Sequence, residues 1–284
     1  STPKQFLKIA GKKVIEHTIN MFQASRHIDE ICVVVHHDYE RDIEEICLHN
    51  NFTKLKKILA GGKERYESSL AAINAYASEG ECNIIFHDSV RPLVNERIID
   101  DVIKALDSYD AVDVAVPTTD TIIQVNDSDE IVNIPPRQFL RNGQTPQAFK
   151  LSVIKEAYDK ALLDPQFKTT DDCGVVLKYM PHVPVYVVKG EQFNMKLTYK
   201  EDLFLIDKLF QLKSLLSTSA PLTEEEKSAL AGKTIVIFGG TEGIGLEITQ
   251  LCRKLGMNVH AVSRRSGTDA VSYTHLRAHE TGAY

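Results

Sequence analysis

The sequence predicts an α/β protein built on a mostly parallel sheet, and two observations point to that fold class. Short runs rich in β-branched residues alternate with stretches of helical periodicity from residue 30 to residue 190. The composition, 43% hydrophobic and 25% charged, is ordinary for a globular protein, and no apolar run reaches membrane-spanning length. Because such alternation forms βαβ units, we expect helices on both faces of a Rossmann-like sheet.

The individual elements follow from local patterns. A polar turn, Asn126 to Asp129, separates two short β-prone runs between Thr121 and Pro135, which predicts a protruding β-hairpin. This hairpin is interpreted either as a sheet edge or as an arm that reaches a second subunit, since an isolated ribbon needs a packing partner. The predicted strands are 30–36, 56–61, 83–88, 113–117 and 183–190, and helical periodicity is clear in 94–106 and 151–163.

Charge and cysteine usage exclude several classes of protein. The net charge of −6 and the pI of about 5.9 argue against a nucleic-acid binder, although local lysines and arginines could still hold a small phosphorylated ligand. The five cysteines are scattered without a Cys-x-x-Cys pair, so disulfides and metal–thiolate sites have little support. The sequence also has no signal-peptide pattern. It therefore predicts a cytoplasmic protein that does not enter a membrane.

The chain is predicted to contain two domains of unequal completeness. We expect a first domain over residues 1–211, a polar linker over 212–231, and the start of a second Rossmann domain over 232–270. The segment 271–284 loses all periodicity, and its sequence resembles a translated sequencing-library adapter, so it is interpreted as non-native. These features suggest a chain truncated at both ends.

A glycine-rich turn opens the predicted second domain. Gly239, Gly243 and Gly245 follow a strand and lead into an amphipathic helix, a context that favours binding of a dinucleotide pyrophosphate at the helix N-terminus. The stretch resembles the start of short-chain dehydrogenase/reductases, in which Arg264 would bind the 2′-phosphate of NADP. A tight turn in any α/β domain is the alternative. The catalytic Ser and Tyr-x-x-x-Lys of that family lie beyond this stretch, so reductase activity is not expected from this chain.

Polar and cationic residues cluster where the predicted strands of the first domain end. Lys4, Arg65, Arg91, Arg137, Arg141 and Lys196 would face one acid, Asp88, which is typical of a site for a multiply phosphorylated ligand and a divalent ion. Each segment also has a purely structural interpretation: Gly61 and Gly62 as a turn, Asp88 as a cap, and Thr198 with Glu201 as a capping box. The segments are 3–6, 61–69, 87–92, 134–149 and 194–198.

These segments give the chain a family resemblance. Over residues 1 to about 210 it closely resembles the cytidylyltransferases that include the methylerythritol-phosphate and ribitol-5-phosphate enzymes. Followed by a reductase-like start, the layout resembles bifunctional enzymes that make CDP-ribitol and also reduce ribulose 5-phosphate. Family members carry a glycine-rich loop directly before the first motif, and this sequence starts after it. The matching motifs are PKQF, GGKERYESS, HDSVRP, Asp120-Thr121, GQTPQAF, Thr170 to Asp172, and NMKLTYKEDL.

The resemblance implies a nucleotidyltransferase fold, a homodimer formed through the 121–135 arm, and transfer of a cytidylyl group from CTP to a sugar or polyol phosphate with Mg²⁺. It also assigns roles to residues. Lys4 and Lys196 would be catalytic, and His87 structural. Nucleotide binding would fall to Gly61, Gly62, Ser68 and Asp88, with Asp88 also at the metal, and substrate binding to Arg91, Thr121, Arg137, Thr145, Thr170 and Asp171.

Ribitol 5-phosphate is the expected acceptor, because residues 134–149 look more like the ribitol-phosphate enzymes and the reductase-like start points the same way. Methylerythritol phosphate is the alternative within the class. Outside the class, the protein could be an NADP-dependent reductase with a non-catalytic first domain, or a sugar-phosphate-binding scaffold.

Overall fold

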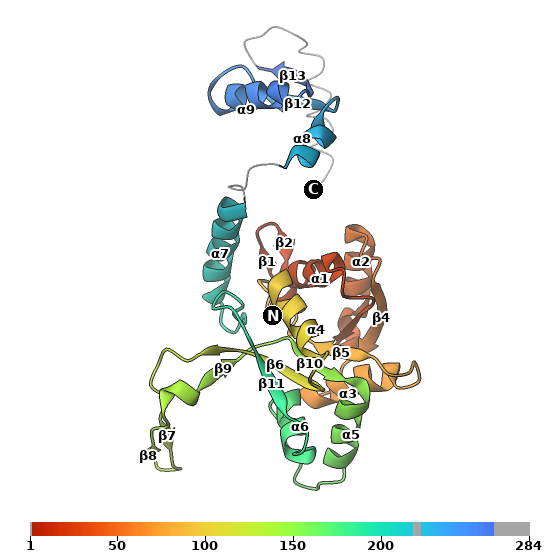
Figure 1. Cartoon of the computed structure of the whole chain (residues 1–284), viewed down its shortest axis with the longest axis vertical. Coiled ribbons are helices and arrows are strands. Elements are labelled where there is room, and N and C mark those ends of the chain that lie inside the picture. The colour runs from red at the N-terminus through yellow and green to blue at the C-terminus, as the bar shows by residue number, and fades with distance from the viewer. Residues whose placement is uncertain (1, 218–222, 264–284) are drawn as a thin grey trace. The chain divides into compact units, whose positions relative to one another are not determined.

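A computed structural model of the chain describes residues 2–217 and 223–263 (Figure 1). The chain divides into two compact units, Ser1–Ser214 and Leu215–Tyr284. Arg264 and the segment 271–284, interpreted above as non-native, lie outside the described residues. Within the described residues, no helix is both long and apolar enough to cross a membrane.

The first unit is organised around a mixed sheet with the strand order β11–β6–β10–β5, to which β9 adds by pairing with β6. Strands β6 and β11 are parallel, whereas β10 is antiparallel to both β5 and β6, and β9 is antiparallel to β6. The expectation of a mostly parallel sheet was therefore wrong for this sheet. The strands are β5 (Asn83–Phe86), β6 (Ala111–Pro117), β9 (Arg141–Gly143), β10 (Gln147–Lys150) and β11 (Val185–Lys189).

The antiparallel strands follow from the path of the chain after β6. Instead of crossing over through a helix, the chain leaves the carboxyl end of β6, makes the hairpin excursion, and re-enters the sheet from that same end. A strand that returns in this way must run opposite to the one it left. The sequence of β10 is only four residues long, too short to predict as a strand from its pattern.

Helices cover both faces of this sheet, as predicted (Figure 1). Successive side chains of a strand point to opposite faces, so Ala111 and Phe149 join the core beneath α3, α5 and α6, while Val112 and Ala148 join the core beneath α4. The Asn95 side chain caps α4 by accepting the Ile98 N–H at 3.0 Å. The helices are α3 (Arg65–Tyr76), α4 (Glu96–Ala105), α5 (Leu151–Ala161) and α6 (Asp172–Tyr179).

The remaining elements of the first unit extend this core. The parallel pair β3 (Ile31–Val35) and β4 (Leu55–Ala60) packs against α1 (Val14–Ala24) and α2 (Glu40–Asn50). With these two, all five strands predicted above are present. The helix α7 spans Asp202–Ser217. Five short elements precede it: η1 (Lys4–Phe6), β1 (Lys8–Ile9), β2 (Lys12–Lys13), η2 (His37–Tyr39) and η3 (Arg137–Phe139).

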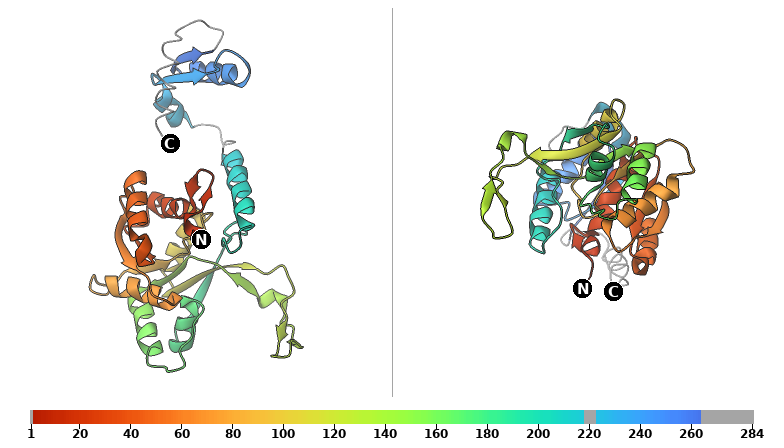
Figure 2. Two further views of the ribbon diagram at one scale, coloured as in Figure 1. Left: turned by 180° about the vertical axis from the view of Figure 1, so that it is seen from behind. Right: turned by 90° about the horizontal axis from the view of Figure 1, so that it is seen from below.

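A two-stranded ribbon extends away from the sheet between β6 and β9 (Figure 2). Strand β7 (Gln124–Val125) pairs antiparallel with β8 (Ile131–Asn133) across a turn in which Asp129 has a positive φ of 60°. The ribbon and its base expose large apolar side chains: Ile122, Ile123, Val125, Ile131, Val132, Ile134 and Phe139.

The second unit contains a βαβ arrangement. Strand β12 (Thr234–Phe238) leads through α9 (Gly243–Lys254) to β13 (Asn258–Val262), which pairs parallel to β12. The segment predicted as a linker, 212–231, is mostly helical where it is described, because α7 continues to Ser217 and α8 spans Glu224–Leu230. Glu, Lys, Ala and Leu favour helix, which explains why α8 forms despite the polar composition.

Candidate active site

The carboxylate of Asp88, just after β5, contacts three cationic side chains. Its Oδ1 lies 3.2 Å from Arg65 Nη1, and its Oδ2 lies 3.0 Å from Arg91 Nε and 3.3 Å from Lys196 Nζ. Burial alone raises the pKa of Asp88, but Lys196, Arg91 and Arg65 together bring that pKa below its ordinary value. Three cations around one carboxylate leave net positive charge, the electrostatic requirement for binding a polyphosphate.

The loop before α7 is fastened to the segment after β5 and carries Lys196 to Asp88. The Leu197 N–H donates to Val90 O at 2.9 Å, and Arg91 Nη1 donates to Asn194 O at 2.8 Å. Asn194 is fully buried, and its side-chain amide donates to Thr145 O at 2.8 Å. These contacts join three predicted site segments that are far apart in the sequence.

Thr145 contacts both the backbone of Asp88 and the side chain of His87. Thr145 Oγ1 accepts the Asp88 backbone N–H at 3.1 Å and lies 3.0 Å from His87 Nδ1. His87 Nε2 lies 3.2 Å from Arg91 O, so this nitrogen carries the proton and Nδ1 accepts from the threonine hydroxyl. Burial lowers the pKa of His87 to about 4, which keeps the imidazole neutral at pH 7. This geometry agrees with the structural role expected for His87.

A second carboxylate, which the sequence analysis did not single out, holds Arg65. Asp172 Oδ2 lies 3.1 Å from Arg65 Nη2, and its Oδ1 accepts the Tyr158 hydroxyl at 2.7 Å. Asp172 is only 1% exposed and begins α6. A signal was present in the sequence, since an acid at the start of a helix that also lies in a family motif is a natural partner for a nearby arginine.

Thr170 and Asp171, which directly precede Asp172, were both predicted to bind substrate. Asp171 caps α6 by accepting the Gly174 N–H at 2.8 Å, and its other oxygen accepts from the side-chain amide of Gln147 at 3.2 Å. Thr170 is exposed, and no hydrogen bond described in the structure joins it to Asp88 or Arg91. Their proposed contacts with a substrate remain predictions.

The predicted nucleotide-binding glycines lie in a loop packed tightly against α3. The Gly61 N–H donates to Val35 O at 2.7 Å, which ties the ends of β3 and β4 together. A Cβ atom on Gly61 would lie 3.0 Å from Ser68 Oγ, and one on Gly62 would lie 2.2 Å from the Glu67 Cβ. Gly62 therefore requires glycine because the loop approaches α3 so closely, whereas a side chain at Gly61 would require Ser68 to shift slightly. Ser68 and Arg65 lie one turn apart on α3, so this helix carries residues of both the loop and the Asp88 cluster.

The other predicted residues fall in two places. Lys4 donates to the backbone carbonyl of Thr198, on the same loop as Lys196. Arg137 lies at the base of the ribbon, where Nη2 is 3.3 Å from Thr121 Oγ1 and neither side chain contacts the Asp88 cluster. Arg141 donates within its own turn, to Gln138 O at 3.0 Å and Leu140 O at 2.8 Å.

The capping box suggested by Thr198 and Glu201 does not form. Instead, Asp202 Oδ2 accepts the N–H groups of Thr198 and Tyr199, each at 2.7 Å. The helix starts three residues later than that capping box predicts, because α7 begins at Asp202.

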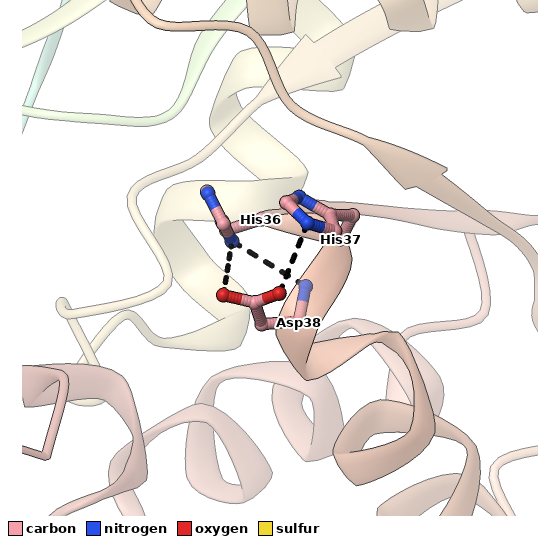
Figure 3. Close-up of side chains that lie close together, drawn as sticks. All are labelled: His36, His37 and Asp38. Atoms are coloured by element: carbon pink, nitrogen blue, oxygen red, sulfur yellow. Dashed lines mark hydrogen bonds and ion pairs between the residues drawn. The ribbon is translucent and has the colours of Figure 1, made fainter.

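The role of Asp88 as a metal ligand remains a prediction. Its two oxygens contact Arg65, Arg91 and Lys196, and a divalent cation bound there would compete with these side chains. In residues 2–217 and 223–263, three candidate ligand atoms come within 4.8 Å of one another only at His36, His37 and Asp38. This exposed group follows β3, and Asp38 lies 3.3 Å from His36 Nδ1 and 3.0 Å from His37 Nε2 (Figure 3).

The glycine-rich turn of the second unit has a backbone that only glycine adopts readily. Gly239 and Gly243 have positive φ angles of 74° and 54°. A Cβ on Gly245 would lie 2.0 Å from Gly239 O, so the first turn of α9 packs directly on the backbone of the loop. The side chain of Glu242, the residue before α9, makes no capping hydrogen bond to that helix. This arrangement fits the cradle expected for a pyrophosphate at a helix N-terminus.

The fold and the cationic site together define an α/β protein arranged to bind a phosphorylated ligand, and comparisons with known proteins specify the family. A family model described as 2-C-methyl-D-erythritol 4-phosphate cytidylyltransferase matches residues 1–211. The structure of 4-diphosphocytidyl-2C-methyl-D-erythritol synthase from Anaerococcus prevotii is similar with a TM-score of 0.68 and 30% identity, over 73% of this chain and 93% of that one.

Two relatives extend this result. A 2-C-methyl-D-erythritol 4-phosphate cytidylyltransferase from Thermobifida fusca is 39% identical over 74% of this chain and 86% of its own length. A bifunctional ribulose 5-phosphate reductase/CDP-ribitol pyrophosphorylase from Haemophilus influenzae is 44% identical over 94% of this chain. The chain spans only 56% of the length of that relative. The chain belongs to the 2-C-methyl-D-erythritol 4-phosphate cytidylyltransferase family of nucleotidyltransferase enzymes.

Proposed function

We propose that this chain transfers a cytidylyl group from CTP to a polyol phosphate, with ribitol 5-phosphate as the acceptor. The observation that carries this proposal is the convergence of Arg65, Arg91 and Lys196 on Asp88 in a chain of the cytidylyltransferase family. In the reaction, an acceptor phosphate oxygen bonds to the α-phosphorus of CTP. The bond from that phosphorus to the bridging oxygen breaks, and pyrophosphate leaves with the electron pair.

Positioning and charge neutralisation supply the catalysis in this proposal. A phosphate monoester is largely dianionic at pH 7, so the nucleophile needs no general base. The neutral His87, whose two ring nitrogens are both engaged, fits this absence of a base. Lys196 and Lys4, on adjoining segments, would stabilise charge at the α-phosphate. Asp88 holds the cations in place until the substrate phosphates compete for them.

The ribitol assignment has two supports. The Haemophilus influenzae relative, which is named a CDP-ribitol pyrophosphorylase, matches nearly the whole chain, the glycine-rich turn included. Reduction of ribulose 5-phosphate also yields ribitol 5-phosphate, so a reductase in the same protein would supply the acceptor. The family description and the Thermobifida fusca relative keep 2-C-methyl-D-erythritol 4-phosphate as the alternative acceptor.

The cofactors belong to the same proposal. Mg²⁺ would enter with the CTP triphosphate, since it commonly binds through substrate phosphates and retains waters, and Asp88 would be its ligand from the protein. In the second unit, Gly239, Gly243 and Gly245 would hold the NADP pyrophosphate, and the reduced cofactor, NADPH, would supply hydride. Its exposed apolar side chains support a larger domain that covers them: Val236, Phe238, Ile244, Ile248 and Leu251.

The partner of the 121–135 ribbon would be a second copy of the chain. A two-stranded ribbon is marginal alone, and this one exposes isoleucines and valines on both strands. Thr121 and Arg137, which lie apart from the Asp88 cluster of their own chain, would then serve the acceptor site of the partner. We assign the dimer to the cytoplasm.

The test is pyrophosphate release by the chain preceded by the glycine-rich loop of a family member, hereafter the loop-bearing chain. With CTP and Mg²⁺, we expect kcat/KM for ribitol 5-phosphate to exceed that for methylerythritol phosphate by at least about a hundredfold, since sites built to bind hydroxyls reject analogues that leave polar groups unpaired. Equal or reversed preference would move the chain to the methylerythritol branch. No turnover with either acceptor would favour a non-catalytic first domain.

A further inference from the structure

A half-buried acid in the middle of β6, Asp113, forms no ion pair described in the structure, although Arg91 is near enough to oppose the rise of its pKa. Asp113 Oδ1 accepts the Val114 N–H at 2.9 Å and the Gln147 side-chain amide at 3.1 Å. Its Oδ2 takes part in no hydrogen bond described in the structure, yet it is not sealed from solvent. A Cβ on Gly143 would lie 4.0 Å from Oδ2, so the neighbouring strand presents no side chain over this oxygen.

A second carboxylate makes this arrangement unfavourable without a ligand. The single amide of Gln147 donates to both Asp113 Oδ1 and Asp171 Oδ2, at 3.1 and 3.2 Å. Burial and the nearby Asp171 raise the pKa of Asp113 to about 6. Asp113 Oδ2 is therefore an acceptor that no described protein group occupies and that is open to solvent, so a hydroxyl of a ligand can donate to it.

The position of Asp113 relative to the cationic cluster is fixed by one short segment. Thr145 contacts the Asp88 backbone, and Gln147, two residues later, contacts Asp113. Two residues of extended chain span roughly 7 Å. Gln147 also links the two groups directly, because its Oε1 accepts the N–H of Asp172, which binds the Arg65 that contacts Asp88.

We propose that Asp113 binds hydroxyl groups of the polyol acceptor, at the end far from its phosphate, and so selects the longer chain of ribitol 5-phosphate. This inference rests on the proposed cytidylyl transfer. The phosphate of the acceptor lies toward Arg91 and Lys196, because two carboxylates repel an anion. The hydroxyl end lies toward Asp113, whose Oδ2 accepts from hydroxyls. Methylerythritol phosphate keeps a hydroxyl on its branched carbon but has one hydroxyl-bearing carbon fewer than ribitol 5-phosphate. A carboxylate that binds the far end of the longer chain would therefore lack a donor, which disfavours methylerythritol phosphate.

The test combines Asp113→Asn with deoxy analogues of ribitol 5-phosphate in the loop-bearing chain. The asparagine retains an oxygen for Val114 and Gln147 but removes the charge. We expect kcat/KM for ribitol 5-phosphate to fall on the order of ten- to a hundredfold, mostly through KM, with the KM for CTP unchanged. Asp159→Asn, an exposed acid on α5, is the matched control and should change neither value.

The deoxy analogues make the assignment specific to a hydroxyl. In the unsubstituted chain, one analogue should lose a factor comparable to that of Asp113→Asn, and in the variant the same analogue should lose less than about twofold. If every analogue and the variant stay within about twofold, the role of Asp113 is refuted while cytidylyl transfer stands. If the unsubstituted chain uses no sugar phosphate, both proposals fail. Should the variant not fold, the analogue series alone decides.

Discussion

Arg65 and Asp172 form an ion pair that joins the first turn of α3 to the first turn of α6, with Nη2 3.1 Å from Oδ2. The arginine is 37% exposed at its side chain, whereas the aspartate is 1% exposed. The other Nη of the same guanidinium contacts Asp88. A buried carboxylate thus fixes the orientation of a cation in the proposed nucleotide site.

We expect Asp172→Asn to loosen this arrangement. The substitution should lower the free energy of unfolding by about 1–3 kcal/mol, less than for a fully buried pair because Arg65 can hydrate. It should also reduce kcat/KM about tenfold, since Arg65 would no longer be held beside Asp88. Chemical denaturation and pyrophosphate release measure the two effects. Asp159→Asn breaks an exposed pair with Lys155 and should cost less than about 0.5 kcal/mol. Equal effects of the two substitutions would contradict a positioning role for Asp172.

Lys196→Ala should cut turnover of the loop-bearing chain by two to three orders of magnitude, by analogy with the loss of a transition-state charge donor elsewhere. Lys196 is half-exposed, and its ammonium lies 3.3 Å from Asp88 Oδ2, so its removal should leave the thermal melt nearly unchanged. Lys200→Ala, on the same loop and exposed, provides the control and should retain full turnover. A rate near that of the unsubstituted chain after Lys196→Ala would refute the catalytic assignment.

The proposed dimer depends on the apolar side chains of the 121–135 ribbon. Replacing Ile123, Ile131 and Ile134 by threonine retains β propensity but removes apolar area, and we expect the molecular mass from light scattering to change from dimer to monomer. The control is Leu163→Thr with Leu177→Thr, two residues that are more exposed than these isoleucines and lie elsewhere on the first unit. A dimer that survives the ribbon substitutions would show that the interface lies elsewhere.

His87 should make the first unit less stable in mild acid. Its pKa is about 4 in the folded chain, against about 6.5 for an unperturbed histidine. The unfolded chain therefore binds a proton that the folded chain does not, and stability falls as the pH drops from about 6.5 to 4. Melting temperatures measured across this range should decline, and His87→Gln should reduce the slope.

Asp113 acts in the opposite sense over part of the same range. Its pKa is about 6 in the folded chain, above the ordinary value for an aspartate. The folded chain therefore binds a proton at a pH where the unfolded chain does not, which favours folding as the pH falls below 6. Asp113→Asn should therefore steepen the acid decline that His87→Gln flattens. Identical pH profiles for both variants would show that neither group titrates as its surroundings indicate.

The sequence alone predicted five of the strands, the helices over 94–106 and 151–163, and the membership of most site segments. Residues 30–36 and 113–117 were predicted as strands because runs of β-branched residues favour an extended backbone. Gly61 and Gly62 were predicted as a turn because glycine adopts backbone conformations that other residues rarely adopt. The importance of Asp88, Arg91, Thr145 and Lys196 was visible because each lies in a family motif. Their mutual contacts were not visible in the sequence, since those contacts join residues from 3 to 108 positions apart in the chain.

Only the tertiary structure decided how these segments combine. The four residues of β10 became an antiparallel strand because the chain returned to the sheet from the end at which it had left, a matter of topology that local pattern does not record. Arg65 pairs with Asp172 and not with Asp171. The Asp171 carboxylate caps α6 by accepting the Gly174 N–H, whereas the Asp172 carboxylate contacts Arg65 on α3. The contacts of Asp88 with three cations from three parts of the chain were also decided by the tertiary structure, because charge neutralisation depends on distance in space and not on separation in sequence.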